Sequence, residues 1–353
     1  MLQVGVRSFI KPADLDSLLR VHCEGRRLAE LERLAGSTTK GVYRLTFDDG
    51  GTLAMYAWRA AENYWPDGTD VAGDPFAGPS CAADFAACHA ALTAASVRVP
   101  RLHVIDVSQD RFPADIALVE DVAGGTLEDL MERDPAAAAE PLARLGRAIR
   151  VMHACKGDQY GKVGPLAAAH AHVSGSVRTA GAERAEDVIA RRAQRHLAAA
   201  AAQVPRLAAV QPELAGLVQA LRADIEPRRD YGLVHGELGP DHVLLDDSHQ
   251  PVVIDIEGLM YFDVEWEHAF LRLRLTADDY ARLGLPAVDE ARVRFYDFAQ
   301  RLSLIEGPLR IAATDYPERD WMLDLADYQT GVVLAALADS RGQRRTASRR
   351  PRS

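Results

Sequence analysis

Residues 231–258 read YGLVHGELGPDHVLLDDSHQPVVIDIEG, and a polar loop, HGELGPDH, follows directly on an apolar run. This loop holds three side chains that can transfer a proton or bind a metal ion. They are His235, Glu237 and His242. The stretch is the strongest strand signal in the second half of the chain, and both the fold and the site are argued outward from it.

The apolar runs VLLD and PVVID on either side of the link DSHQ (247–250) predict an antiparallel β-hairpin. If Asp246 pairs with Pro251, the register places His242 opposite Asp255. Directly opposed residues have Cβ atoms about 5 Å apart. Two polar side chains at the open end of the hairpin could then share one ion or one hydrogen-bond network.

Composition and charge favour a globular protein with an acidic body. The chain has 353 residues, 48% of them hydrophobic, which is typical of a protein with a real core. The net charge is −10, and the six arginines of residues 341–353 leave −16 on the remainder. An acidic body argues against a nucleic-acid-binding surface, and we expect the basic tail to be a disordered, solvated end.

Cysteine usage and hydropathy predict a reduced, soluble, cytoplasmic protein. The four cysteines form no CxxC pair and no Cys/His spacing of the zinc type. We find neither a signal-peptide pattern at the N-terminus nor eighteen uninterrupted apolar residues. We therefore expect no membrane partner.

The first half of the sequence predicts a small antiparallel sheet with one helix. Residues 41–58 alternate around an Asp-Gly turn and predict a β-hairpin, and the runs LHVIDV and ADIALVEDV predict two further strands. Residues 81–95 predict a helix with a buried stripe at three- and four-residue spacing. The stripe consists of Phe85, Cys88 and Leu92. We expect residues 1–122 to form a domain.

The second half predicts helices around the loop and hairpin. Thr126 and Asp129 form a capping box ahead of one helical segment, and helical patterns return at 180–226 and 286–338. We expect residues 123–340 to form a second, mostly helical domain that contains the hairpin. The chain is thus predicted to be α+β.

The loop and the hairpin resemble protein-kinase-like enzymes, in which H-x-D-x-x-x-x-N supplies a base and a metal ligand and a later strand ends in a metal-binding Asp. Here His235, Glu237, His242 and Asp255 keep that spacing, with Glu for Asp and His for Asn. The surrounding HGELGPDHVLL and IDIEG resemble the aminoglycoside phosphotransferase and choline kinase branch. The resemblance implies a two-lobed fold, with a small antiparallel-sheet N-lobe and a larger, mostly helical C-lobe.

Two further segments extend this resemblance. FDVEWEHA (262–269) stands where the branch has Gly-Asp-Pro followed by Asp-Leu-Ala; it matches at Asp263 and has Glu267 for the later Asp. VEDVAGG stands at the connection between the lobes, where the backbone of Glu120 to Val122 would meet the adenine edge of ATP.

The resemblance places the loop that covers the nucleotide phosphates at GSTTKGVYRL (36–45). Its hydroxyls and backbone amides could bond phosphate oxygens. The residues concerned are Gly36, Ser37, Thr38, Thr39 and Lys40.

The third strand departs from the family, because Tyr56 stands where a lysine holds the α- and β-phosphates. A tyrosine donates a hydrogen bond but carries no charge. Lys40 and Arg44 are the candidate replacements, and Asp84 is the carboxylate nearest the place of the acid that pairs with that lysine.

The catalytic loop departs at two positions. Glu237 keeps the carboxylate that orients and deprotonates the acceptor hydroxyl, with one added methylene. His242 replaces an oxygen ligand by a nitrogen that suits Mn²⁺ or Zn²⁺ better than Mg²⁺. Either Asp255 holds Mg²⁺ alone, helped by Asp241 or Glu257, or the site accepts a different ion. The family role of His235 is structural, through a bond to the backbone near Asp255.

Three functions are compatible with these residues. The first is an ATP-dependent phosphotransferase acting on a hydroxyl of a small, cationic molecule such as an aminoglycoside or amino alcohol, which acidic clusters such as DVEWE and TADDY would suit. The second is a pseudokinase that serves as a nucleotide-binding or interaction module. The third is a metal-dependent hydrolase, although Pro240 breaks the helical phase that a zinc-protease motif needs.

Overall fold

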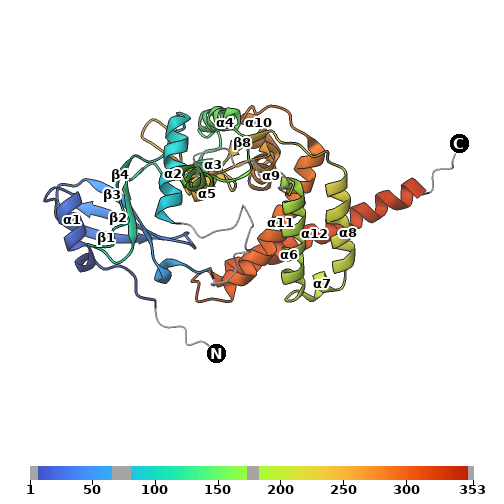
Figure 1. Cartoon of the computed structure of the whole chain (residues 1–353), viewed down its shortest axis with the longest axis horizontal. Helices are drawn as coiled ribbons and strands as arrows, with labels where there is room; N and C mark the ends of the chain where they lie inside the picture. The colour runs from blue at the N-terminus through green and yellow to red at the C-terminus, as the bar shows by residue number, and fades with distance from the viewer. Residues whose placement is uncertain (1–6, 66–80, 173–182, 349–353) are drawn as a thin grey trace. The chain divides into compact units, whose positions relative to one another are not determined.

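The computed structural model describes residues 7–65, 81–172 and 183–348 (Figure 1). Contacts divide the chain into two compact units. The first comprises residues 1–177, 230–267 and 274–286, and the second comprises 178–229, 268–273 and 287–353. The expected domain boundary at residue 122 lies inside the first unit and stays a prediction.

A five-stranded antiparallel sheet forms the N-terminal part of the first unit, with the strand order β1-β2-β3-β5-β4 (Figure 1). The strands are β1 (Leu28–Leu34), β2 (Gly41–Phe47), β3 (Thr52–Trp58), β4 (Leu102–Asp106) and β5 (Asp115–Val119). The hairpin predicted at 41–58 and the two later strands are confirmed. The turn forms because Gly50 adopts a φ of +80°, which a side chain would disfavour, and Phe47 N–H donates to Gly51 O at 2.9 Å.

The register of the sheet sorts its side chains onto two faces. Tyr43 lies opposite Met55, and Met55 lies opposite Leu118, so these residues share one face and form a core with Leu18 of α1 (Asp16–His22). Tyr56 points to the other face. This alternation decides which strand residues can reach the site.

Helix α2 (Ala82–Ala94) packs on the face that carries Tyr56. The ring of Phe85 meets the ring of Tyr56 edge to face, with centroids 5.4 Å apart. Phe85, Cys88 and Leu92 are all buried, so the predicted stripe is confirmed.

The first unit contains further helices, one of which begins at the predicted capping box. The capping box is confirmed, because Asp129 N–H donates to Thr126 Oγ1 at 3.0 Å and Thr126 N–H donates to Asp129 Oδ2 at 3.1 Å. These elements are η1 (Pro12–Leu15), η2 (Ala60–Glu62), α3 (Leu127–Arg133), α4 (Ala139–Ala154), α5 (Val163–His172), η3 (Pro240–His242), η4 (Ile256–Gly258) and α10 (Ala277–Arg282); α9 (Val264–Arg274) spans both units.

A second sheet, with the order β6-β8-β11-β7, leads into the catalytic loop. Its strands are β6 (Lys156–Gly157), β7 (Gly161–Lys162), β8 (Tyr231–Val234) and β11 (Met260–Phe262). The sequence predicted only the strand signal at 232–256. Strands of two or three residues carry no periodic pattern, and β6 and β7 pair with partners far along the chain.

The hairpin of β9 (Val243–Leu245) and β10 (Pro251–Val253) is confirmed, but its predicted register is wrong by one residue. Pro251 lies opposite Leu245 rather than Asp246. The cause is the turn, because Asp246 N–H donates to Gln250 O at 3.1 Å and the Asp246 carboxylate accepts from Ser248 and Gln250. His242 is therefore opposite Ile254, whose N–H donates to His242 O at 3.0 Å.

The second unit consists of helices, as predicted for 180–226 and 286–338 where the structure describes them. They are α6 (Ala185–Ala201), α7 (Pro205–Ala208), α8 (Gln211–Ala223), α11 (Glu290–Ala312) and α12 (Arg319–Ser348). Figure 1 shows α11 and α12 side by side. None of the described helices is long and apolar enough to cross a membrane.

The C-terminal tail departs from the expectation of a disordered segment at 341–353. Helix α12 continues through Ser348, and Arg341 Nε donates to Glu213 Oε2 of α8 at 2.8 Å. Arg, Gln and Ala are good helix formers and outnumber the single poor one, Gly342, in this stretch. Residues 349–353 lie outside the described residues.

Candidate active site

Asp255 is the centre of a buried ion-pair cluster. Its Oδ1 lies 2.6 Å from Lys40 Nζ, and Glu257 Oε1 lies 2.9 Å from the same nitrogen. The Lys40 side chain is 4% exposed and that of Glu257 6%, whereas Asp255 is 43% exposed. The cluster is therefore internal on the side of Lys40 and open on the side of Asp255.

The charges of this cluster stabilise one another. Burial alone would lower the pKa of Lys40, but Asp255 and Glu257 outweigh burial and raise it well above its ordinary value. In turn, the Lys40 ammonium holds the pKa of Asp255 well below its usual range. Both groups are ionised at neutral pH, so the site offers a fixed cation beside a partly exposed carboxylate.

Lys40 reaches this place from the last turn before β2, not from β3. Its N–H donates to Ser37 Oγ at 3.3 Å, and its Nζ lies 5.4 Å from the centroid of the Tyr56 ring. Tyr56 is buried, and burial raises the pKa of its hydroxyl, so the residue is a neutral wall beneath the cation.

Arg44, the other candidate replacement, is engaged elsewhere. Its Nε donates to Asp121 Oδ2 at 2.9 Å, and its Nη1 donates to Glu32 Oε2 at 3.1 Å. The second carboxylate on Lys40 is Glu257, and Asp84 instead lies in the first turn of α2.

The backbone of Asp255 is in the left-handed region, with φ 56° and ψ 45°. A non-glycine residue there stores strain of about 1 kcal/mol or more, and such strain concentrates at functional sites. Asp255 directly precedes η4, which carries Glu257, so the turn brings both carboxylates to one cation.

His235 makes the contact expected of it. The residue is 1% exposed, and its Nε2 lies 2.8 Å from Ile254 O, the carbonyl that precedes Asp255. Burial lowers the pKa of His235 to about 4, so the ring is neutral and Nε2 carries the proton that it donates. The bond joins the catalytic loop to the end of the hairpin.

His242 is held between the loop and Asp255. Its Nδ1 bonds Glu237 O at 2.7 Å, and its Nε2 lies 3.7 Å from Asp255 Oδ2. Burial would lower the pKa of His242, but Asp255 and Asp241 outweigh burial and raise it. Both ring nitrogens of His242 face an oxygen of this site, Glu237 O and Asp255 Oδ2.

Glu237 is exposed and lies near the start of the loop, two residues after His235. The surrounding protein nevertheless disfavours its charged form. Desolvation and the carboxylates of Asp255 and Asp241 raise the pKa of Glu237, against the opposing effects of His242 and Lys162. A carboxylate with a raised pKa accepts a proton more readily near neutral pH.

Glu267 and Trp266 support the loop from α9 and were not among the predicted site residues. The Glu267 carboxylate accepts His235 N–H at 2.6 Å, and Trp266 Nε1 donates to Gly236 O at 2.8 Å. Burial raises the pKa of Glu267 to about 7, partly offset by the loop N–H groups. The available signal was the segment FDVEWEHA, in which Glu267 replaced an expected Asp.

The connection from Glu120 to Val122 is fixed by ion pairs. Arg98 Nη2 donates to Glu120 Oε1 at 2.6 Å, and Glu120 N–H donates to Arg101 O at 2.9 Å. Just beyond, a Cβ on Gly124 would lie 2.1 Å from Leu245 O, so only glycine allows the connection to pass this close to the hairpin.

The part of the chain that the structure describes holds no group of three or more His, Cys, Asp or Glu side chains arranged for a metal ion. Mg²⁺ at phosphoryl-transfer sites needs only one or two carboxylates, because water and substrate phosphates supply the other ligands. The partly exposed Asp255 meets that requirement, and His242 as a metal ligand stays a prediction.

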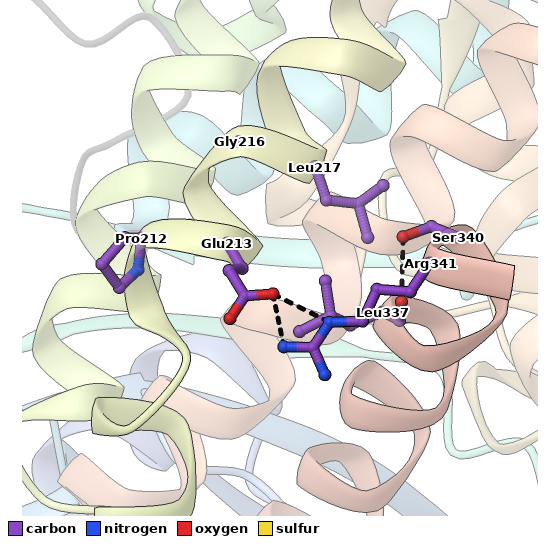
Figure 2. A pocket seen from close by; sticks show the side chains of 7 residues that line it. All are labelled: Pro212, Glu213, Gly216, Leu217, Leu337, Ser340 and Arg341. Carbon is purple, nitrogen blue, oxygen red and sulfur yellow. Dashed lines mark hydrogen bonds and ion pairs between the residues drawn. The ribbon is translucent and has the colours of Figure 1, made fainter. Parts of the chain in front are cut away.

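A separate hollow of about 270 Å³ lies in the second unit, along α8 and α12 (Figure 2). Leu217 and Leu337 form its apolar side, and the ion pair between Glu213 and Arg341 lines it as well. None of the predicted site residues lines this hollow.

A family model for the phosphotransferase enzyme family matches residues 74–319, well over half of the chain. The chain belongs to the phosphotransferase enzyme family. No curated protein matches it in a comparison of sequences. The match includes the loop, the hairpin and α9, but begins after the predicted covering loop.

Solved structures of the same kind resemble this phosphotransferase over most of its length. A thermostable mutant of aminoglycoside phosphotransferase APH(4)-Ia is 18% identical, with 92% of this chain and 99% of that chain covered at a TM-score of 0.60. Spectinomycin phosphotransferase APH(9)-Ia is 13% identical, with 91% of this chain and 95% of that chain covered at a TM-score of 0.63. Choline kinase LicA from Streptococcus pneumoniae is 12% identical, with 90% of this chain and 98% of that chain covered at a TM-score of 0.59.

At these identities the likeness shows the fold. The predicted α+β, protein-kinase-like fold is confirmed, as is the resemblance to the aminoglycoside phosphotransferase and choline kinase branch. Family membership supports phosphotransferase activity on small molecules and nucleotide binding.

Proposed function

We propose that this phosphotransferase transfers the γ-phosphoryl group of ATP to a hydroxyl of a small, cationic acceptor such as an aminoglycoside or amino alcohol. One observation carries the proposal: Lys40 Nζ lies 2.6 Å from Asp255, whose carboxylate is 43% exposed. A fixed cation beside an open carboxylate is what phosphates and their metal ion require. Structural neighbours with AMP-PNP and hygromycin B, or with ADP and spectinomycin, support the ligand classes.

Lys40 takes the part of the missing third-strand lysine. Its buried ammonium, paired with Glu257, is pre-positioned to hold the α- and β-phosphates, while Tyr56 provides the neutral surface under it. Gly36, Ser37, Thr38 and Thr39 cover the phosphates from the same loop. Glu120 N–H already donates to Arg101 O, so the adenine edge would be read by the Glu120 carbonyl and by Val122.

Asp255 would hold Mg²⁺, which neutralises charge on the phosphates when bound. Glu237 orients the acceptor hydroxyl and takes its proton as the bond from the acceptor oxygen to the γ-phosphorus forms and the bond to the β-phosphate oxygen breaks. His242 keeps the Glu237 carbonyl and the Asp255 carboxylate in place through its two ring nitrogens. His235 fixes the end of the hairpin through Ile254 O.

Thermal stabilisation by ATP tests the nucleotide part of this proposal. We expect the melting temperature to rise with ATP and Mg²⁺, and to rise with Mn²⁺ as well. No shift with Mg²⁺, with Mn²⁺ or without metal would exclude the enzyme.

ATP consumption over a panel of amino sugars and amino alcohols tests the acceptor. Turnover should disappear in Asp255→Ala. It should fall by about a hundredfold or more in Glu237→Gln, which removes the accepting charge and nearly preserves the shape. Equal turnover by Glu237→Gln and the unchanged protein would refute the role of Glu237.

A nucleotide-binding module without turnover is the second candidate, because Tyr56, Glu237 and His242 all differ from the family pattern. The placement of His242 favours it specifically, because Nδ1 of this ring already bonds Glu237 O and Nε2 faces Asp255. A thermal shift with ATP that does not depend on metal, together with no turnover on any acceptor, would select this candidate.

A further inference from the structure

The loop that carries Lys40 is tied to the segment that follows β3. Thr38 O accepts Tyr64 N–H at 2.8 Å, and Thr38 Oγ1 accepts Trp65 Nε1–H at 3.0 Å. Trp65 is itself oriented by a bond from its N–H to Asn63 Oδ1 at 2.9 Å. The first half of the covering loop is thus held at Thr38 by a backbone bond and a side-chain bond together.

The second half of the covering loop rests on Glu62, a carboxylate that is 0% exposed. Glu62 accepts a hydrogen bond from Tyr43 OH and another from Arg33 Nη2 at 2.9 Å. A Cβ on Gly41 would lie 2.7 Å from Glu62 Cδ, so the chain passes against this carboxylate too closely for any side chain. The exit of the loop into β2 is therefore fixed as firmly as its centre.

Lys40 lies between these two anchors. Thr38 is two residues before it, and Gly41 is the next residue. A buried carboxylate is costly unless its partners replace the lost water, and Arg33 and Tyr43 do this for Glu62. No step of the phosphoryl transfer uses Glu62, and its contacts all lead to the covering loop and its flanking strands.

We propose that residues Glu62–Trp65, here called the brace, are a positioning element that sets Lys40 Nζ beside Asp255 and so determines the affinity for the nucleotide phosphates. This inference rests on the proposed function, because the brace is proposed to position the lysine of that site. The brace would act on the nucleotide phosphates through Lys40.

Two nearly isosteric variants test the side-chain bond of the brace. Trp65→Phe removes the Nε1–H donor and keeps an aromatic ring, and Thr38→Val removes the acceptor and keeps the branched shape. Each should weaken the Kd for ATP with Mg²⁺ by about 3- to 10-fold, the equivalent of one hydrogen bond, as measured by calorimetry. The double variant should be no weaker than either single one, because both remove the same bond.

Passage of the effect through Lys40 is tested in a Lys40→Met background. There, Trp65→Phe should leave the Kd for ATP unchanged, which a general loss of stability would not predict. Asp49→Ala is the matched control, because it removes an exposed 2.8 Å ion pair with Arg26 at the other end of the β2–β3 hairpin. Its Kd for ATP should equal that of the unchanged protein.

Hydrogen exchange separates failure of the brace from failure of the proposed function. Without nucleotide, the amides of residues 38–41 should exchange faster in Trp65→Phe than in the unchanged protein. Unchanged exchange, or an unchanged Kd in both single variants, would overturn the brace. If the unchanged protein does not bind ATP, the proposed function fails, and faster exchange would still support the brace as the element that holds Lys40.

Discussion

Two buried clusters of opposite charges, one in each compact unit, differ in which carboxylate lies nearest to the cation. In the first unit, Lys40 is 4% exposed and its nearest partner Asp255 is 43% exposed. In the second unit, Arg292 is 3% exposed and its nearest partner Glu186 is 1% exposed, while the 45% exposed Asp289 lies 3.7 Å from Arg292 Nε. The open cluster thus presents an exposed carboxylate beside its cation, whereas the closed cluster presents a buried one.

The closed cluster is completed by the backbone. Arg292 Nη1 lies 3.0 Å from Glu186 Oε1, and Arg228 N–H donates to the same oxygen at 3.1 Å. Arg292 Nη2 also donates to Glu226 O. The bonds to the Glu186 carboxylate converge on Oε1, and its buried Oε2 has no hydrogen-bond partner among the described residues. This pair joins α6 to α11, whereas the open pair of Lys40 and Asp255 is suited to binding.

Removing the closed cation should have the largest effect on stability. Arg292→Met leaves Glu186 buried without its cation, and we expect the free energy of unfolding to fall by about 3–5 kcal/mol. Urea denaturation measures this loss. The double variant Arg292→Met with Glu186→Gln should recover part of it, and a loss below about 1 kcal/mol would show that the cluster is not closed.

Glu267 provides the case of a buried carboxylate with no cation beside it. Its pKa is raised from 4.5 to about 7, so the folded protein retains a proton that the unfolded chain releases between those values. Its contribution therefore lowers stability as the pH rises through this window, by about 3 kcal/mol in total. Glu267→Gln lacks this titration.

The measurement is the difference in unfolding free energy between Glu267→Gln and the unchanged protein at pH 5 and pH 8. We expect the variant to gain about 2–3 kcal/mol relative to the unchanged protein over that range. The comparison cancels the other titrating groups, including His235. A constant difference would mean that Glu267 is ionised at both pH values.

Removing the cation of the open cluster should affect ATP binding more than folding. Lys40→Met removes a charged donor, and we expect the affinity for ATP with Mg²⁺ to fall by about 10- to 100-fold. The loss of stability should be smaller than for Arg292→Met, because the exposed side of Asp255 keeps its contact with water. Arg26→Met, which removes a half-buried cation just before β1, should leave the affinity unchanged in the same titration.

An exposed pair of the same chemistry should matter least. Arg341 and Glu213 are 49% and 50% exposed, and Arg341→Met should lower the unfolding free energy by no more than about 1 kcal/mol. The effect should vanish in high salt, where exposed charges are screened. A loss comparable with that of Arg292→Met would mean that burial does not separate the two pairs.

Local patterns in the sequence determined much of the fold. Alternation around the Asp-Gly turn predicted the hairpin at 41–58, and the stripe of Phe85, Cys88 and Leu92 predicted α2, because these periodicities repeat within a few residues. The spacing of His235, Glu237 and His242 predicted the kind of loop in the same way. Such signals depend only on neighbours along the chain.

Tertiary structure alone decided the register of the hairpin and the source of the cation. The Asp246 turn shifted the pairing by one residue, which alternation in two three-residue strands could not reveal. Lys40 contacts Asp255 across 215 residues of sequence. Arg44, an equally good candidate from the sequence alone, pairs with Asp121 instead. Which of the two cations reaches the carboxylate depends on how the sheet and the covering loop pack, because charge alone makes them equivalent.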